Sequence, residues 1–162
     1  MKHEFNLADA IDVIEEVLAS GGEFQMFPKG TSMLPLIHQG RDSVTLVRHV
    51  PMHPIRRYQI AFYRRDNGQF VLHRIVKIGK DGCYTMCGDN QLQYEPGIRQ
   101  EQIIGVVSSM NRKGRERKMR GFGNAVYVLT HCVSPMRHIS WFLRHGTQKI
   151  MRIFAARKSK SS

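Results

Sequence analysis

Between residues 24 and 110 the sequence is a succession of short β-type runs divided by turn signals. The runs cover residues 24–28, 43–47, 59–64, 70–78, 83–87 and 102–110. Asp66-Asn67-Gly68 is a strong turn signal, and Lys80-Asp81-Gly82-Cys83 is typical of a tight hairpin. Runs of this length joined by short turns predict a mainly β body, built as a coiled sheet or a partly open barrel.

One helix is predicted ahead of this body, over residues 7–19. Its apolar side chains recur at three- and four-residue spacing and are Leu7, Ala10, Ile11, Ile14, Val17 and Leu18. Asn6 is suited to cap the start of the helix, and Gly21-Gly22 is suited to end it. The apolar stripe predicts that this helix packs against the sheet.

The sequence changes character after residue 110. Residues 111–120 are a run of charges and mark a candidate boundary. Beyond them two segments with helical patterns, 125–132 and 139–156, are separated by Pro135. The predicted layout is an N-terminal helix over 1–23, a β-rich core over 24–110 and a basic helical extension over 111–162.

The charge of the chain is concentrated in that extension. Residues 1–110 carry 12 basic and 12 acidic side chains, whereas residues 111–162 carry 13 basic and one acidic. A neutral core argues against a nucleic-acid groove, and the extension has no stacking-aromatic pattern that would indicate nucleic-acid binding. Segment 139–156 reads as a basic amphipathic helix, which predicts either a docked terminal helix or peripheral contact of residues 111–162 with an anionic membrane.

Cysteine usage and hydropathy indicate the compartment. The three cysteines, Cys83, Cys87 and Cys132, do not form an even disulfide framework, which fits a reducing environment. No signal peptide is recognisable at the start of the sequence. The longest uncharged stretch, 121–136, contains several polar residues and does not resemble a transmembrane span. These features predict a cytoplasmic protein or one peripheral to the membrane.

Gly30-Thr31-Ser32-Met33-Leu34-Pro35 is the first segment with catalytic potential. A serine that follows a glycine-bearing turn can have its hydroxyl exposed and its backbone N–H free. Acyl transfer needs these two groups, one as the nucleophile and the other as an oxyanion donor. Ser32 is therefore a candidate nucleophile, although a serine in a turn before proline is also common without catalysis.

His73 and Asp89 are the candidate partners of Ser32. His73 interrupts a β-branched run and, by strand alternation, shares a face with Val71, Ile75 and Lys77. Asp89 follows the hairpin return in Gly88-Asp89-Asn90, where a carboxylate across the hairpin is suited to orient an imidazole. The alternatives are a core histidine and a turn carboxylate that binds its own backbone.

In this order the segments resemble the sequence boxes of the signal peptidase I family, which belongs to a larger group with the SOS-repressor-type self-cleaving peptidases. Ser32-Met33-Leu34-Pro35 is similar to the nucleophile box, and His73-Arg74-Ile75-Val76 is similar to the base-bearing box. Bacterial signal peptidases generally carry lysine there, whereas the endoplasmic-reticulum-type branch carries histidine. Further similar segments are 41–46, Gly88-Asp89-Asn90 and 102–107, so the resemblance covers about residues 24–110.

The resemblance implies a serine endopeptidase with a β-rich catalytic core and no metal or organic cofactor. Ser32 would attack the scissile carbonyl, and its own N–H would contribute to the oxyanion hole. His73 would be the general base and then the general acid, with Asp89 holding its tautomer. Glu95 is the alternative acid, because the histidine-type branch has a further carboxylate past Gly-Asp-Asn. The expected substrate is a leader or signal-like peptide, bound as an extended strand and cleaved at a small-residue site.

Two kinds of alternative remain open. Lys77 is the alternative base, because the repressor-type branch uses lysine and Lys77 lies on the predicted face of His73. The alternative functions are a self-cleaving regulator, cut near Ala19-Ser20-Gly21-Gly22, and a non-catalytic peptide-binding module on the same fold. Cys83-x-x-x-Cys87 does not have zinc-site spacing, so no metal site is expected.

Overall fold

The protein is mainly β, as the sequence predicts. The structure is a computed structural model that describes residues 7–49, 54–119, 122–129, 138–139 and 142–143. In chain order its elements are α1 (Leu7–Ala19), β1 (Glu23–Met26), β2 (Asp42–Val47), β3 (Ile60–Arg64), β4 (Phe70–Ile78), β5 (Tyr84–Cys87), β6 (Glu95–Ile98), a short 3-10 turn (Gln100–Gln102), β7 (Ile103–Arg112), β8 (Arg115–Lys118) and α2 (Phe122–Tyr127).

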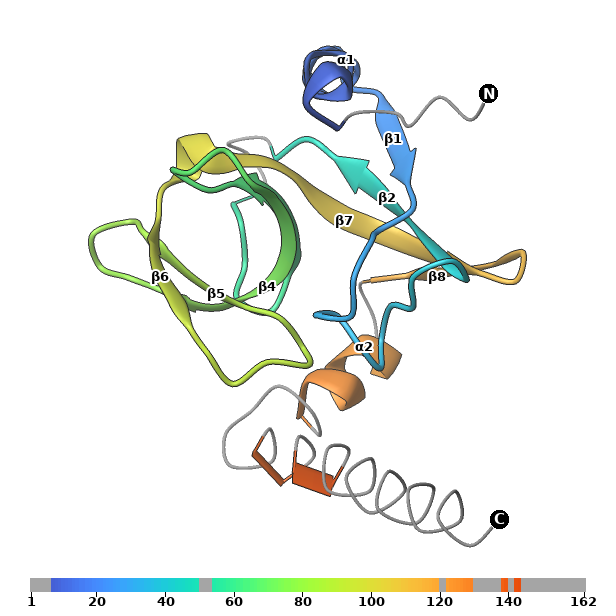
Figure 1. The fold of residues 1–162 in the computed structure, drawn as a ribbon, viewed down its shortest axis with the longest axis vertical. Helices are drawn as coiled ribbons and strands as arrows, with labels where there is room; N and C mark the ends of the chain where they lie inside the picture. The colour runs from blue at the N-terminus through green and yellow to red at the C-terminus, as the bar shows by residue number, and fades with distance from the viewer. Residues whose placement is uncertain (1–6, 50–53, 120–121, 130–137, 140–141, 144–162) are drawn as a thin grey trace, which may run out of the picture.

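All the strands belong to one antiparallel sheet that coils without closing. The strand order is β1-β2-β7-β3-β4-β5-β6. The eighth strand, β8, is not part of this order and pairs with the last residues of β7. Figure 1 shows β4, β5 and β6 curling into a ring-like half, while β1, β2 and β8 lie around the far end of β7. The predicted coiled sheet or partly open barrel is therefore confirmed in its open form.

Two apolar clusters lie on the two sides of this coiled sheet. The first joins α1 to the sheet and to the loop after β1, through Ile14, Leu18, Met33, Ile37 and Phe62 among others. The second lies among the curled strands β3 to β7 and includes Tyr63, Ile75, Met86, Ile98 and Val106. Alternate residues of β3 and β4 thus point into different clusters, as strand geometry requires.

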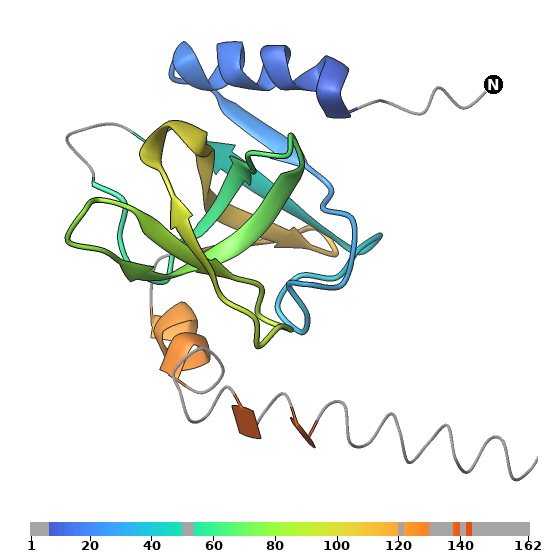
Figure 2. The same cartoon turned by 60° about the vertical axis from the view of Figure 1, so that its left-hand side comes forward.

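The N-terminal helix forms over the predicted residues and ends where its glycines stand. Gly21 N–H donates to Leu18 O (3.2 Å) and Gly22 N–H donates to Val17 O (2.9 Å). This pair of bonds is the usual way in which a glycine terminates a helix and satisfies its last carbonyls. Figure 2 shows α1 lying across one end of the sheet, opposite α2. The proposed capping residue Asn6 lies outside the described residues.

Two strands were not expected from the sequence. β6 has the sequence Glu95-Pro96-Gly97-Ile98, whose proline and glycine favour a turn, yet it forms an edge strand because it pairs with β5. β8 consists of Arg115–Lys118, all exposed, and folds back along β7 as a hairpin. The sheet therefore continues to Lys118, past residue 110 where the predicted β-rich core ends, and through most of the candidate boundary over 111–120.

The C-terminal extension is described only in part. α2 begins at Phe122, three residues before the helix predicted over 125–132. Residues 138–139 and 142–143 are helical, and the remainder of the helix predicted over 139–156 lies outside the described residues. In the portion of the chain that is described, no helix has the length and apolar character needed to cross a membrane.

Candidate functional site

Ser32 lies in the loop between β1 and β2, beside a small pocket. The side chain is partly buried, and the pocket has a volume of about 100 Å³. One wall is the segment Pro28 to Gly30 with Ser32 itself, and the other is the start of β4, from Phe70 to Leu72. The loop that carries Ser32 is thereby brought against the strand that carries His73.

Short local bonds shape the loop around Ser32. Gly30 N–H donates to Gln39 Oε1 (2.6 Å), which joins the two ends of the loop. Leu34 N–H donates to Thr31 O (3.2 Å) and Ile37 N–H to Met33 O (2.9 Å), so the stretch after Ser32 consists of tight turns. Met33 and Ile37 are buried in the cluster beneath α1 and anchor the loop to the core.

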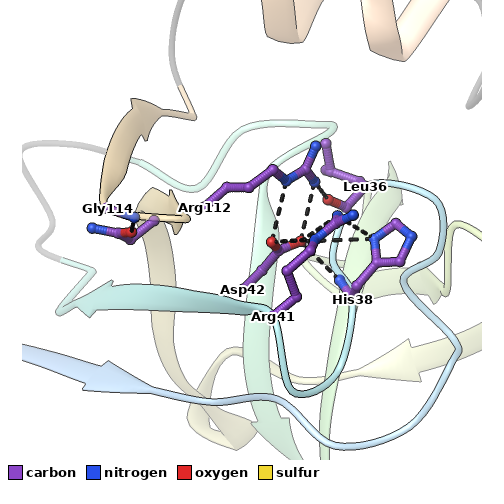
Figure 3. Close-up of polar contacts among 7 residues, drawn as sticks. Leu36, His38, Arg41, Asp42, Arg112 and Gly114 are labelled. Carbon is purple, nitrogen blue, oxygen red and sulfur yellow. Dashed lines mark hydrogen bonds and ion pairs between the residues drawn. The ribbon is translucent and has the colours of Figure 1, made fainter.

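Asp42, the first residue of β2, fastens the far end of this loop. Its fully buried carboxylate accepts bonds from Arg41 (Nε, 2.8 Å), Arg112 (Nε, 3.1 Å) and the backbone N–H of His38 (2.9 Å). Arg112 also donates to the carbonyl of Leu36. Figure 3 shows Arg41 and Arg112 converging on this carboxylate. The cluster ties the end of the Ser32 loop to the end of β7, the strand that pairs with β2.

The charges around Asp42 keep it ionised. Burial alone would raise the pKa of its carboxyl, but the hydrogen bonds from Arg41 and Arg112 outweigh that effect and hold the pKa well below its usual range. The ionised group therefore contributes to stability at neutral pH.

His73 lies in the middle of β4 and is 4% exposed. β3 pairs with β4 along residues 70–74, whereas β5 pairs with β4 only between Arg74 and Ile78. Within the described residues no strand pairs with 70–72 on the β5 side. The start of β4, just before His73, therefore has an open edge next to the loop of Ser32.

The turn Gly88-Asp89-Asn90 is bonded directly to the Ser32 backbone. Asn90 N–H donates to Ser32 O at 2.7 Å. A Cβ atom on Gly88 would lie 2.7 Å from the same carbonyl oxygen, too close for any side chain. Glycine at this position is thus required for the turn to approach Ser32.

Asp89 makes its main ion pair with Arg74, the residue after His73. Its two oxygens accept from Arg74 Nε (2.8 Å) and Nη2 (2.7 Å), and neither side chain is exposed. The remaining guanidinium nitrogen of Arg74 donates to the Tyr58 carbonyl at 2.7 Å. The pair locks the turn after β5 onto β4, so Asp89 has a structural role beside the orienting role expected for it.

Glu95 reaches His73 through a tyrosine. Tyr63 Oη donates to Glu95 Oε2 at 2.8 Å and lies 3.3 Å from His73 Nδ1. Arg65 binds both oxygens of Glu95, from Nε and Nη2, each at 2.7 Å. The bonds from Arg65 lower the pKa of Glu95, while burial, together with the Glu95 contact, raises the pKa of Tyr63. The alternative acid is therefore ionised and connected to the imidazole.

Lys77 lies on the same strand as His73 but in a different environment. A bulge between Ile75 and Lys77 interrupts the alternation on which their shared face was predicted. Lys77 is exposed, whereas His73 is buried.

Cys83 and Cys87 differ in burial. Cys83 is partly buried, and the buried Cys87 Sγ donates to the carbonyl of Gln93 at 3.1 Å. Among the residues that the structure describes, no three His, Cys, Asp or Glu side chains gather as metal ligands would.

Tyr63, Arg65 and Arg74 were not identified as site residues from the sequence. A signal for Tyr63 was present, because a tyrosine in a buried strand needs a partner for its hydroxyl. An arginine that follows the candidate base within a β-branched run likewise needs a carboxylate if it is buried. Neither signal identifies the partner, since Asp89 approaches β4 through the pairing of β5 with β4, and Glu95 on β6 approaches β3 through the coiling of the sheet.

The structure therefore brings the loop of a partly buried serine, with its small pocket, against the strand of a buried histidine that has an acidic partner beyond a tyrosine. Base-assisted acyl transfer needs such a set of groups. No model of a protein family and no curated protein matches this sequence.

Proposed function

We propose that the chain is a serine endopeptidase in which Ser32 is the nucleophile and His73 the general base, acting on leader or signal-like peptides. The observation that carries the proposal is the set of bonds that fastens three sequence segments together. Asn90 N–H binds Ser32 O, Asp89 binds Arg74, and the Ser32 pocket borders β4. The segments that the sequence singled out for catalysis are thus neighbours.

In the proposed reaction Ser32 Oγ attacks the scissile carbonyl and gives its proton to His73. The imidazolium then protonates the leaving amine, and water hydrolyses the acyl-enzyme by the reverse roles. The Ser32 N–H is the first oxyanion donor, and one such donor is typically worth about 3–4 kcal/mol of transition-state stabilisation. The acid behind His73 is Asp89 or Glu95, and the chain of bonds through Tyr63 favours Glu95.

The open edge of β4 supports binding of the substrate as an extended strand. Residues 70–72 have an edge on the β5 side along which an added strand can pair. The adjoining pocket of about 100 Å³ is smaller than a cavity of roughly 150 Å³ that accommodates benzene. It therefore fits a small side chain next to the cleaved bond, as in Ala-x-Ala sequences.

An anionic membrane surface is the partner proposed for residues 111–162. Large apolar side chains are exposed there at the described positions Val126, Leu129, Ile139, Phe142 and Leu143. They accompany a strong excess of basic residues, which is the combination that binds anionic headgroups. Sedimentation with anionic liposomes at low salt, lost at high salt or with neutral lipid, is expected. Equal recovery with neutral liposomes would contradict electrostatic binding.

Cleavage of a peptide library tests the catalytic proposal. Peptides with Ala-x-Ala and related small-residue sites are incubated with the wild type and with Ser32→Ala, His73→Ala and Lys77→Ala, with and without anionic liposomes. Mass spectrometry should find cleavage by the wild type and Lys77→Ala and none by the other two. Thr31→Ala is the matched control, because it removes an adjacent exposed hydroxyl.

The same experiment separates the alternatives. Cleavage that survives Ser32→Ala contradicts the proposed nucleophile. Loss of activity in Lys77→Ala with retention in His73→Ala makes Lys77 the base. A fragment of the protein itself that begins near residue 20, absent in Ser32→Ala, indicates self-cleavage. Binding of library peptides without cleavage under both conditions indicates a non-catalytic peptide-binding module.

A further inference from the structure

Tyr63 stands between the candidate base and its acid. The phenol oxygen lies 3.3 Å from His73 Nδ1 and 2.8 Å from Glu95 Oε2. The tyrosine is fully buried and His73 is 4% exposed, so bulk water does not compete for these contacts. The rings of Tyr63 and His73 are tilted by 56° with centroids 6.2 Å apart, so the hydroxyl rather than the ring face meets the imidazole.

The protonation of the three groups follows from the charge on Glu95. Arg65 holds both oxygens of this carboxylate, which is therefore ionised and can only accept. The Tyr63 hydroxyl must give its one proton to Glu95, which leaves its oxygen as an acceptor for His73. The proton of the neutral imidazole is then on Nδ1, and Nε2 carries the lone pair that a general base uses.

The coiling of the sheet creates this arrangement. Tyr63 and His73 are on neighbouring strands, where Ala61 is opposite His73 and Tyr63 is opposite Val71. Glu95 is on β6, which is separated from β3 by two strands in the sheet order. The bonds from Tyr63 and Arg65 to Glu95 therefore cross the interior of the coil. They connect the imidazole to β3 through Tyr63 and to β6 through Glu95.

We propose that Tyr63 is the positioning residue of the site. Its hydroxyl accepts the Nδ1 proton of His73 and connects the imidazole to the negative charge of Glu95 through two successive hydrogen bonds. The inference rests on the proposed function for the role of His73 as a base. It makes a neutral phenol a group in direct contact with the imidazole.

A phenol in this place has a chemical consequence. Burial raises the pKa of Tyr63, so the hydroxyl stays protonated throughout the working range of a histidine base. The negative charge of Glu95 stabilises the imidazolium formed during catalysis across the intervening Tyr63 hydroxyl. The positive charge of Arg65 opposes this stabilisation. Arg74, the next residue of β4, and Asp89, in the turn after β5, form an ion pair beside the strand position of His73. The contact that fixes the tautomer is thus made by a neutral hydroxyl group.

Nitrogen NMR of the histidine ring tests the inference without any substrate. In the full-length protein at pH 8, ¹⁵N shifts of His73 should report the Nδ1–H tautomer in the wild type. Tyr63→Phe should convert this signal to a mixture of the two tautomers. Tyr84→Phe is the matched control, because Tyr84 is also a buried tyrosine of the curled strands and should leave His73 unchanged. An unchanged Nδ1–H tautomer in Tyr63→Phe would overturn the inference.

The kinetics of the reaction and their pH dependence give a second test of the positioning role of Tyr63. Tyr63→Phe should lower kcat by about tenfold to a hundredfold with KM unchanged, the usual effect of removing a group that orients a reacting one. Glu95→Gln keeps an acceptor for Tyr63 and removes the charge. Its acid limb in kcat/KM should move to lower pH, because the imidazolium loses a stabilising anion. An acid limb that stays in place in Glu95→Gln contradicts the connection through Tyr63.

The two proposals fail in different ways. If the NMR signals behave as expected but no peptide is cleaved, Tyr63 positions His73 in a protein that is not a peptidase. If peptides are cleaved through Ser32 and His73 while Tyr63→Phe changes neither the tautomer nor kcat, the proposed function holds and the positioning role is wrong.

Discussion

Arg74 and Asp89 form a bidentate ion pair in which both side chains are completely buried, with N–O distances of 2.8 and 2.7 Å. The Arg74 guanidinium also faces the ring of Tyr127, at 5.5 Å from its centroid. One pair thus connects β4, the turn bonded to Ser32 and the helix that begins the C-terminal extension. The residue beside the candidate base is therefore a structural centre of the site.

Replacing Asp89 by Asn should destabilise the protein strongly. The substitution leaves the Arg74 charge buried without its counter-ion, which in other proteins costs about 3–5 kcal/mol of folding free energy. Urea unfolding of Asp89→Asn measures this loss, with Asp81→Asn in an exposed turn as the control. A variant that is as stable as the wild type but impaired in cleavage would instead make Asp89 the acid that orients His73.

Gly88→Ala should impair the site more than the fold. The added methyl group would lie 2.7 Å from Ser32 O, so the turn or the Ser32 loop has to move. A shift of about 1 Å in a catalytic group is enough to lower a rate about a hundredfold. We expect a fall in kcat of that order, measured on a peptide that the wild type cleaves. Gly82→Ala, in the exposed β4–β5 turn, is the control for strain in a turn, and an equal fall there would contradict the explanation.

The fold was largely predictable because its signals are local. The β-rich composition of β4, turn chemistry at Gly68 and Gly82, and the spacing of apolar residues in α1 each depend on neighbours in sequence. The strand β6 was missed because Pro96 and Gly97 oppose the extended conformation that pairing with β5 imposes. In the same way, the exposed charges of β8 have no local β preference, and the strand forms on the template of β7.

The site was predictable only in its residue types. Ser32, His73 and the turn at Asp89 were singled out along the sequence, but their partners depend on the coil of the sheet. Asp89 was expected to orient the imidazole, and the structure adds a bidentate bond to Arg74 that the sequence analysis did not foresee. Tyr63 and Glu95 meet across strands that are 32 residues apart in sequence, a separation that periodicity cannot detect.

Asp42→Asn should make the stability of the protein less dependent on acid pH. The depressed pKa of Asp42 means that its ionised form stabilises the fold above the ordinary carboxyl pKa of about 3.9. This contribution is lost as the pH falls below that value towards the lower pKa of the folded state. Urea unfolding should find the Asp42→Asn variant less stable than the wild type by more than about 1 kcal/mol at pH 7, with a difference that shrinks below about pH 4. Asp12→Asn, which alters an exposed carboxylate of α1, removes the same charge and should have little effect at any pH.

Val71→Ala should widen the choice of side chain next to the cleaved bond. Val71 lines the pocket beside Ser32, and shortening it provides room for additional carbon atoms of a substrate. Discrimination in apolar pockets is about 10-fold to 200-fold for one methylene group. We expect kcat/KM for a peptide with Leu at this position, relative to one with Ala, to rise about tenfold. Val76→Ala, on the same strand but outside the pocket lining, is the control for a general loosening of β4. A ratio that is unchanged in Val71→Ala, or equally raised in Val76→Ala, would mean that this pocket does not select the substrate.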